Sequence, residues 1–543
     1  MICSLVRFLM DVDRSREHLQ EIVDTLVCED GIKETVATPT VTLERPKYRA
    51  HGDWTTNVAF SLAGILRKAP SEIARNLAQI VRDRAIFGDA YVAAVGGYVN
   101  ITLSHEQYAK ILVAILTSGA RYGITQTVHP QKVIIEYVSA NPTGPIHLGN
   151  ARGGPYGDVL AKVLTAVGHH VVREYYINDA GNQVEILGHS ILGDDQAQYA
   201  GTYIVALRER LLGQHRNADA RAIGEMATQI IVDEIIRPSL AAAHITFDRW
   251  FSEKILHESG AVDATVTALT QKGYTYKKDG ASYFRATDFG DDKDRVLIKA
   301  DGSKTYFCVD AAYHCDKLRR ADRLINIWGA DHGGTVARLR GALTALGHND
   351  VLDVILTQFV RVVEDGKEVK MSKRHGTYIT LADLVDDVGV DVVRFTFLMQ
   401  SATSHIVFDL ARAREQSDKN PVYYVQYAHA RMASVLRKAM EYALSYDDVD
   451  ATILTHERER ALMQTLTDFA PIITRTADDY GVHRLPHYAI RIADDLHAFY
   501  ATCTVIDKND IARTKARLAL VDATKQVLFE VLQIIGVAAP EKM

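Results

Sequence analysis

The sequence is poor in cysteine and has no long apolar run. Its five cysteines are odd in number, widely scattered and never form a CxxC pair, which argues against a disulfide framework and a zinc site. Cys308, His314 and Cys315 come nearest to a ligand cluster, but their spacing matches no zinc pattern. No apolar run approaches the roughly 18 residues of a membrane span. We therefore expect no protein-bound metal and no membrane.

The N-terminal residues also lack the features of a secretory leader. The short apolar run in MICSLVRFLM meets acids and arginines within a dozen residues, and no small-residue cleavage site follows it. A cytoplasmic protein is therefore expected. The phosphate-binding pattern GxxxxGK[ST] is absent as well, so the chain has no P-loop.

An excess of positive charge is missing too. The net charge of -6 disfavours a nucleic-acid partner on average, because neutralised phosphates supply most of the affinity for such partners. Basic residues nevertheless cluster outside the central region, at Arg45, Lys47, Arg49, Arg67, Lys68, Arg82, Arg84, Arg431, Arg437, Lys438, Arg513, Lys515 and Arg517. These clusters are either solvated helix faces or nucleic-acid contacts, and composition leaves both open.

The length of 543 residues allows about three or four domains. Residues 1–115 mix helical spacing in SREHLQEIVDTLV with strand-like alternation in GGYVNITL, which predicts a small α+β domain. Residues 401–543 contain, from about Asn420 onward, only long amphipathic helical patterns, which predict an all-α bundle.

Residues 116–400 predict a Rossmann-type parallel sheet. The apolar run Val133–Val138 is a short strand, a helical pattern follows up to Val167, and VVREYYIND is a second strand. Strand, loop, helix and strand form a βαβ unit, whose handed crossover makes the sheet parallel. A mostly helical insertion is expected over about 188–303. A turn at Asp365 and Gly366 precedes a polar loop at 366–376.

The loop between the first strand and its helix reads NPTGPIHLGNARGG, from Asn141. Prolines and glycines pack little apolar area, so folding alone explains this composition poorly. A helix N-terminus at the carboxyl end of a parallel strand attracts phosphate. His147 and Asn150 share a face if the turn is already helical, and both then reach one phosphate oxygen. A tight strand-to-helix turn without a ligand remains the alternative.

A second motif, Lys370-Met371-Ser372-Lys373, follows a late strand. The pair P-x-H-x-G-[HN] and KMSK, in this order and separated by a long insertion, resembles the signature of class I aminoacyl-tRNA synthetases. Other segments resemble the arginyl-tRNA synthetase family along essentially the whole chain: HGDWTTNVAFSLA, GGYVNITL, EYVSANPTGPIHLGNARG, REYYINDAGNQ, TYFCVDAAYH, WGADH, VKMSKRHGTYITLADLVDDVGVDVVRF and NPVYYVQYAHAR.

The resemblance implies that the chain activates L-arginine with ATP to arginyl-adenylate and pyrophosphate, then transfers the arginyl group to the 3′ end of arginine tRNA. It implies catalytic roles for His147, Asn150, Lys370 and Lys373. It implies ATP contacts by Pro145, His147, Gly149, Asn150, Gly329, His332, Met371 and Ser372. Mg²⁺ is expected to accompany the nucleotide, held mainly by phosphates and water. Asn150 departs from the second histidine of the motif and cannot be protonated, which puts its share of phosphate stabilisation in question.

Arginine requires a carboxylate for its planar guanidinium and an acceptor near its α-amine. Positions matching the family's arginine-binding residues are Glu136, Asn141, Tyr306, Asp310 and Asp331. Tyr306 and Asp310 lie one helical turn apart, so both can face one ligand. Taken singly, Glu136 is as well explained as an edge-strand charge and Tyr306 as a core aromatic.

The resemblance assigns residues 1–115 to the tRNA elbow and residues 401–543 to the anticodon. Tyr98 offers a ring for stacking and Asn100 an amide for a base edge. Tyr424, Tyr427, His429 and Arg431 are candidates for stacking and phosphate contact in the bundle. Tyr98 is equally explained by strand packing, and helical spacing places some of the bundle aromatics in the core. A monomer is expected.

Two alternatives stay open at this stage. One is a synthetase for another amino acid, or a smaller nucleotidyltransferase with the same motif, against which the helical C-terminal region and the EYVSAN and TYFCVD segments speak. The other is a catalytically silent, synthetase-like RNA-binding paralogue. Asn150 would favour the silent paralogue, whereas the intact KMSK tetrapeptide favours an active enzyme.

Overall fold

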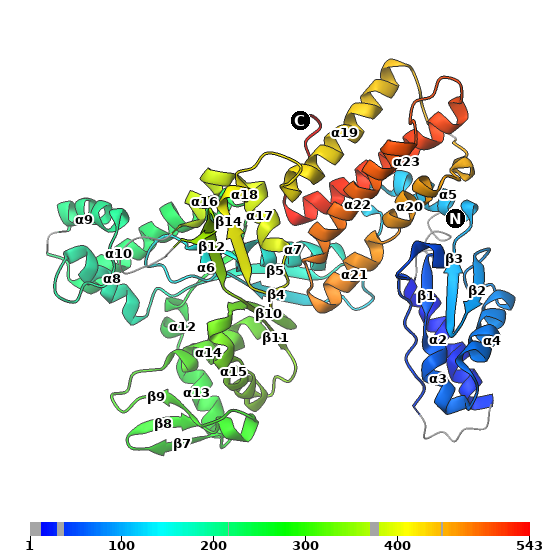
Figure 1. Ribbon diagram of the computed structural model, residues 1–543. Helices are drawn as coiled ribbons and strands as arrows, with labels where there is room; N and C mark the ends of the chain where they lie inside the picture. Colours follow the sequence, from blue (N-terminus) through cyan, green and yellow to red (C-terminus); the bar gives the residue numbers. More distant parts are fainter. Residues whose placement is uncertain (1–11, 30–36, 216, 370–378, 447–448) are drawn as a thin grey trace.

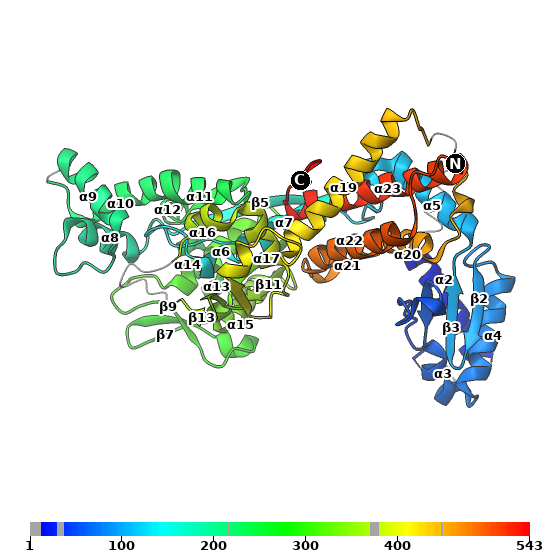
Figure 2. The same cartoon turned by 45° about the horizontal axis from the view of Figure 1, so that its top comes forward.

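The structure is a computed structural model that describes residues 12–29, 37–215, 217–369, 379–446 and 449–543. These residues form an elongated molecule in which a small N-terminal domain is attached to a helical bundle that joins a central α/β body (Figure 1). The N-terminal domain and the helices of residues 182–230 lie at opposite ends in a second view as well (Figure 2). Within the described ranges, no helix is both long and apolar enough to cross a membrane.

The N-terminal domain is α+β, as its sequence predicts. Its antiparallel sheet has the strand order β1-β3-β2, and helices α2, α3 and α4 pack with it around a separate apolar core. Its elements are α2 (Val12–Glu29), β1 (Trp54–Thr56), α3 (Val58–Leu66), α4 (Pro70–Asp83), β2 (Tyr91–Val95) and β3 (Tyr98–Thr102). The two-residue turn between β2 and β3 begins at Gly96, whose φ of 60° suits glycine.

Helix α5 (His105–Ser118) starts at a capping box formed by Ser104 and Gln107, and it packs against the bundle. The N-terminal domain is also attached to the bundle by polar contacts. Arg45 pairs with Asp468, and Arg49 pairs with Asp495 at 2.7 Å. The domain is therefore held to the bundle rather than to the central sheet.

The central sheet is parallel and has the strand order β11-β10-β4-β5-β6. The strands are β4 (Lys132–Glu136), β5 (His170–Ile177), β6 (Arg249–Ser252), β10 (Arg323–Gly329) and β11 (Leu352–Thr357). After β4 the chain continues to β5 on one side, and after β10 it continues to β11 on the other side. The order therefore reverses between β4 and β10, where ligands of open parallel sheets bind.

Helices cover both faces of this sheet, which explains why its first strand reads as a continuous apolar run. Helix α7 (Gly153–Ala166) packs on one face, toward which Val133 and Ile135 point. Helices α14 (Tyr306–Leu318) and α15 (Gly333–Leu346) cover the other face, where Ile134 packs with Leu339. Both faces of the sheet are thus buried. A ligand can approach the sheet at the carboxyl ends of its strands.

The segment expected as a helical insertion is more mixed than predicted. It contains strand β6 of the central sheet and a separate antiparallel sheet of order β7-β8-β9. Its elements, with helix α8 just before them, are α8 (Asn182–Leu192), α9 (Thr202–Gln214), α10 (Ala220–Ile230), the π-helix η3 (Ile231–Ile236), α11 (Arg237–Ala242), α12 (Lys254–Glu258), α13 (Ala261–Gln271), β7 (Thr275–Lys278), β8 (Ala281–Phe284) and β9 (Arg295–Ile298). Strand β6 was not predicted from the sequence, because it has only four residues and pairs with a single neighbouring strand.

A small sheet, β13-β12-β14, follows the central sheet. The predicted turn at Asp365 and Gly366 joins β12 (Val360–Glu364) to β13 (Lys367–Glu368), and both turn residues have positive φ, 49° and 74°. Strand β14 (Ile406–Asp409) pairs with β12 in parallel. Helices α16 (Leu381–Val388), α17 (Val390–Leu398) and α18 (Leu410–Ala413) belong to the same region.

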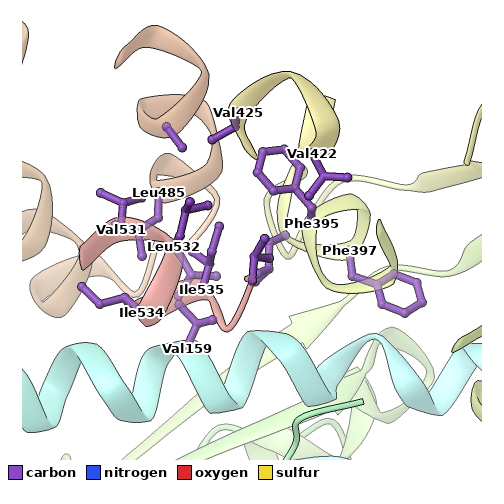
Figure 3. Close-up of a cluster of buried hydrophobic side chains, with 14 of the residues drawn as sticks. Val159, Phe395, Phe397, Val422, Val425, Leu485, Val531, Leu532, Ile534 and Ile535 are labelled. Atoms are coloured by element: carbon purple, nitrogen blue, oxygen red, sulfur yellow. The ribbon is translucent and has the colours of Figure 1, made fainter. Parts of the chain in front are cut away.

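The C-terminal region is a helical bundle, as predicted. Its main helices are α19 (Pro421–Glu441), α20 (Glu457–Leu466), α21 (Phe469–Asp479), α22 (Arg484–Thr502) and α23 (Ile511–Ile535). Val159 of α7, Phe395 of α17 and Ile535 of α23 converge in one apolar cluster (Figure 3). The bundle therefore shares its core with the helix that follows the NPTGPIHLGN loop.

Candidate active site

The carboxyl edge of the sheet, between β4 and β10, collects most of the residues singled out in the sequence. Glu136 ends β4, and Asn326 of β10 lies directly beside it in the ladder. The chain leaves β4 through residues 137–147 and leaves β10 through Gly329–His332. Two loops from distant parts of the sequence thus diverge from one point of the sheet.

The chain turns sharply after β4 through two residues in the left-handed region. Val138 has a φ of 65° and Ser139 a φ of 37°. Residues other than glycine rarely adopt such values, and β-branched residues such as valine adopt them least. The Ser139 hydroxyl accepts a hydrogen bond from the Tyr176 amide at 3.1 Å, which helps to hold the turn. Strained backbone of this kind gathers at functional sites. The sequence did not predict this left-handed turn, because neither residue is glycine.

Residues 141–150, called the signature loop below, lead directly into a helix. His147 caps α6 (Leu148–Ala151), and the Asn150 amide donates to the His147 carbonyl at 3.0 Å. The chain is therefore helical at Asn150, whereas His147, with a φ of -89° and a ψ of 162°, is still extended. His147, Asn150 and Pro145 are half-buried, whereas Gly149 is exposed. The loop presents its polar groups at the surface of the sheet edge.

A Cβ atom at Gly149 would lie 3.0 Å from the His147 ring. At Gly144, where φ is 159°, a Cβ would lie 2.9 Å from the Tyr203 ring, and the Tyr203 hydroxyl donates to the Thr143 carbonyl at 2.9 Å. Both glycines thus permit close approaches within the protein. Tyr203 comes from α9, so the segment after β5 packs against the signature loop.

The residues that follow the KMSK tetrapeptide pair with the signature loop. His147 forms an isolated antiparallel bridge with Thr380, and the Leu381 amide donates to the Ile146 carbonyl at 2.8 Å. Thr380 also caps α16 through a capping box with Asp383. Lys370, Met371, Ser372 and Lys373 themselves lie outside the described residues. The chain that follows them therefore reaches His147 despite its distance in the sequence.

Three buried or half-buried carboxylates converge beside the signature loop. Glu136, Glu253 and Asp310, called the carboxylate cluster below, come from the ends of β4 and β6 and from α14. The Tyr176 hydroxyl donates to Glu253 Oε2 at 2.7 Å. Burial raises the pKa of Tyr176 well above its usual value, and the negative charges of all three carboxylates act on it as well. One hydroxyl thus lies within electrostatic reach of the whole cluster.

Asp310 is the member of the cluster whose carboxylate has neither a hydrogen-bond nor an ion-pair partner among the described residues. Burial raises its pKa to about 7, and the negative charge of Glu136 is the next cause. A half-buried carboxylate left open in this way favours a cationic ligand, because burying an unpaired charge is costly.

Glu136 is already paired. Its carboxylate binds the Lys317 ammonium, which is fully buried and also donates to Asn326 Oδ1 at 3.0 Å. The same ammonium lies 4.3 Å from the centre of the Tyr313 ring. Lys317 offsets one negative charge of the cluster, so the cluster remains negative overall.

The remaining predicted arginine-binding residues lie near this cluster, and their side chains are exposed. Tyr306 is exposed at the start of α14, one turn before Asp310, and is therefore not a core aromatic. Asn141 is exposed at the start of the signature loop. Tyr199 lies near the loop, since Thr143 and Tyr306 both act on its hydroxyl, whose pKa burial raises. The structure thus groups these side chains at one edge of the sheet.

The loop after β10 lies at the same edge. Gly329 ends the strand, and Asp331 and His332 occupy the short turn η5 (Ala330–His332) before α15. Both side chains are exposed, with His332 Nε2 3.7 Å from Asp331 Oδ2. The Trp328 and His332 ring centroids are 6.0 Å apart. Asp331 is more exposed than Asp310, which makes Asp310 the stronger candidate for a guanidinium.

Sequence inspection missed several residues of this site. Glu253 stands directly after β6, at the carboxyl edge where ligands of parallel sheets bind, but β6 was expected to be part of an insertion. Tyr176 and Lys317 gave no signal, because a tyrosine in a strand and a lysine in a helix are ordinary residues there.

Tyr98 and Asn100 differ in their exposure. Tyr98 is 46% exposed, and its ring makes an edge-to-face contact with Phe60 at 5.2 Å between centroids. Asn100 is 7% exposed, and its Oδ1 accepts a hydrogen bond from the Thr55 hydroxyl at 2.7 Å. The base contact by Asn100 stays a prediction, with its Oδ1 already bonded within the sheet.

The candidate residues in α19 divide in the same way. Tyr427 is 49% exposed and stacks on His497 of α22, while Arg431 lies over the Tyr500 ring at 4.5 Å. The Tyr424 hydroxyl donates to Asp494 at 2.8 Å. His429, in contrast, is buried and bonded to the Pro540 carbonyl, so its suggested RNA contact is corrected.

The described residues contain no group of three or more histidine, cysteine, aspartate or glutamate side chains that could hold a metal ion. Burial raises the pKa of Cys308 to about 12 and that of Cys315 to about 11, so both thiols stay protonated. A cavity of about 300 Å³ lies at the opposite, amino edge of the sheet, near Arg323, Arg340 and His348. It contains none of the predicted residues.

Comparisons with known proteins agree with this architecture. Three family models match the chain: Arginyl tRNA synthetase N terminal domain over residues 13–103, tRNA synthetases class I (R), catalytic domain, over residues 111–205 and 214–400, and DALR anticodon binding domain over residues 425–543.

Curated relatives cover almost the whole length. An arginine–tRNA ligase of Geobacillus thermodenitrificans is 42% identical over 98% of this chain and 100% of the relative, and that of Bacillus subtilis is 40% identical over 98% and 99%. The Thermus thermophilus arginyl-tRNA synthetase structure has a TM-score of 0.75 over 97% of this chain and 100% of that one, at 22% identity.

The parallel sheet with its signature loop and the matched catalytic domain define a class I aminoacyl-tRNA synthetase. Such enzymes use ATP. Within this class the chain belongs to the arginyl-tRNA synthetase family, and its activity is arginine–tRNA ligation.

Proposed function

We propose that the carboxylate cluster binds the two cationic groups of L-arginine. Asp310 takes the guanidinium, because its carboxylate is half-buried and no described cation pairs with it. The exposed ring of Tyr306 lies one helical turn away and covers the same ligand. Asn141 and Glu136 take the α-amine end, and the ion pair with Lys317 holds the Glu136 carboxylate in place.

Glu253 is the second guanidinium carboxylate in this proposal. Its charge acts on Asp310, and the Tyr176 hydroxyl fixes one of its oxygens. A planar guanidinium has five donors, so it suits two carboxylates better than an ammonium does. Asp331 is exposed and stays a weaker candidate for the α-amine.

The signature loop and the turn after β10 bind ATP in this proposal. The arginine carboxylate attacks the α-phosphorus, the bond to the bridging oxygen breaks, and pyrophosphate leaves. His147 and Asn150 donate to the charge that develops at the α-phosphate, and Lys370 and Lys373 donate to the departing pyrophosphate. Pro145, Gly149, Gly329, His332, Met371 and Ser372 complete the ATP contacts.

Mg²⁺ enters with ATP in this proposal. Phosphate oxygens and water are the ligands that Mg²⁺ usually keeps when it binds with a nucleotide. The ion offsets the charge of the β- and γ-phosphates. The protein side chains named above orient the nucleotide.

In the second step, a hydroxyl of the 3′-terminal adenosine of arginine tRNA attacks the arginyl carbonyl, and AMP leaves. We assign Tyr98 to the tRNA elbow because its ring is exposed on the N-terminal domain. We assign Tyr427 and Arg431, and the rim residue Tyr424, to the anticodon because they line one face of α19 and α22. The polar attachment of the N-terminal domain to the bundle supports two contacts on one tRNA.

Arginine-dependent exchange of pyrophosphate into ATP tests this proposal. We expect exchange with arginine in the presence of arginine tRNA, and none with the other amino acids. A parallel reaction without tRNA shows whether activation requires it. The open, half-buried Asp310 carboxylate is the observation that carries the assignment, and the absence of arginine-specific exchange with tRNA would overturn it.

Domain limits near 115 and 400, the monomeric state and a cytoplasmic location remain predictions. Sedimentation of the purified chain tests the oligomeric state.

A further inference from the structure

Arg152 is a buried arginine next to the signature loop whose role the proposed reaction leaves open. It stands between α6 and α7 and is 2% exposed. Burial lowers the pKa of its guanidinium to about 10, and among the described residues no carboxylate pairs with it. A buried charge without an anion is costly, so packing alone explains it poorly. An apolar side chain would fill the same volume at lower cost.

The guanidinium of Arg152 binds two backbone carbonyls from remote segments. One Nη donates to Gln358 at 2.5 Å, and the other donates to Ser401 at 2.7 Å. Gln358 directly follows β11 and lies two residues before β12, and Ser401 lies between α17 and β14. The Gln358 amide in turn donates to the Ala402 carbonyl at 3.0 Å. One side chain therefore joins the two segments that lead into the small sheet.

The signature loop also contacts the start of α16 on the other side of α6. There the Leu381 amide binds the Ile146 carbonyl, and Thr380 bridges His147. Those contacts are made by the loop backbone, whereas Arg152 holds the far end of α6. His147 and Asn150 lie between the two attachments, so both determine where these side chains point.

We propose that Arg152 is a positioning residue for adenylate formation, which fixes α6 to the small sheet so that His147 and Asn150 face the α-phosphate. The inference rests on the proposed function of the signature loop. Arg152 itself touches neither substrate. Its carbonyl acceptors require a planar, two-pronged donor, which lysine reproduces only in part.

Steady-state ATP–pyrophosphate exchange with arginine tRNA present tests the proposal in Arg152→Met and Arg152→Lys. We expect kcat/KM for ATP to fall about 100-fold in Arg152→Met, the effect of misplacing catalytic groups by about 1 Å. Arg152→Lys keeps one donor and should lose about 10-fold, corresponding to one lost hydrogen bond from a charged group. The KM for arginine should stay within about threefold, because the carboxylate cluster belongs to other elements.

Two control variants separate positioning from stability. Arg394 is the other buried arginine of the described residues, and it binds Asp158 of α7 and the carbonyls of Ala243, His244 and Ile535. Arg394→Met should lower Tm at least as much as Arg152→Met, yet change the ATP parameters little. Tyr156→Phe removes one bond from α7 to the Tyr480 carbonyl and should be close to wild type in exchange.

A normal kcat/KM for ATP in folded Arg152→Met would overturn the proposal. So would equal losses for arginine and ATP, or the same ATP defect in Arg394→Met, since both outcomes indicate a general loss of structure. If Arg152→Met does not fold, Arg152→Lys decides by the same split. Failure of the wild-type chain to catalyse arginine-dependent exchange would instead contradict the proposed function.

Discussion

The carboxylate cluster and the signature loop are neighbours that are built in opposite ways. Two of the three carboxylates of the cluster are buried and Asp310 is half-buried, Lys317 and Tyr176 hold the charges in place, and the members come from two strand ends and one helix. The signature loop is half-buried, rich in glycine and proline, and held by backbone contacts to Thr380 and Leu381. The carboxylate cluster is ordered before its ligand binds. The position of the signature loop depends on the distant segments that contact it.

The difference teaches where each kind of specificity resides. A buried carboxylate discriminates strongly, because an uncharged ligand leaves it unpaired in the interior. A half-buried set of donors discriminates little between ligands, but it stabilises charge that appears during the reaction. We therefore expect Asp310 and its neighbours to determine the specificity for the amino acid, and His147 and Asn150 to determine the rate of adenylate formation.

The largest effect is expected at Asp310. Asp310→Asn keeps the shape and removes the charge, so kcat/KM for arginine should fall about a thousandfold, as for truncation of a buried charge pair. The KM for ATP should change far less. Exchange assays with each substrate varied in turn measure both values. Equal effects on the two substrates would show that Asp310 does not bind the amino acid.

The pH dependence sharpens this comparison. Burial raises the pKa of Asp310 to about 7 in the free protein, so its carboxyl group loses its charge as pH falls through 7. Arginine is a cation throughout this range, and it binds the ionised form. kcat/KM for arginine should therefore decline about tenfold per pH unit below 7. Asp310→Asn should abolish this dependence, and a decline that persists in the variant would belong to another group.

A smaller effect is expected in the signature loop. His147→Ala removes a donor aimed at the reacting phosphate, so kcat for exchange should fall about a hundredfold. The KM for arginine should remain within about threefold, the reverse of the split at Asp310. His348→Ala is a matched control, since it removes an exposed imidazole at the opposite, amino edge of the sheet. A rise in the arginine KM on His147→Ala would contradict the division of roles.

The two regions differ in how far they could be predicted from the sequence. The signature loop could be found directly, because its glycines, prolines and histidine are unusual residues at a strand-to-helix junction. Its position between two strands could be predicted as well, since a parallel sheet gathers its ligand at the carboxyl edge. The left-handed turn at Val138 and Ser139 could not, because neither residue type indicates such a backbone.

The carboxylate cluster was found only in part for a different reason. Its members come from three strands or helices that are far apart in the sequence, and each looks ordinary by itself. Glu253 was missed because β6 is four residues long and lies in a segment expected to be an insertion. Lys317 was missed because its pairing with Glu136 depends on how α14 lies over the sheet. Packing across the sheet, rather than local pattern, brings these charges together.

The smallest effect is expected at Asn150, which departs from the second histidine of the motif. Asn150→Ala should lower kcat about tenfold through loss of one hydrogen bond to a charged group. Asn150→His should change kcat by no more than about threefold, because the half-buried position lets water supply a missing donor. Exchange kinetics of the two Asn150 variants and of His147→Ala, measured together, rank the three losses in kcat. A large gain in Asn150→His would mean that a protonated donor is needed there, and that asparagine limits the rate of this enzyme.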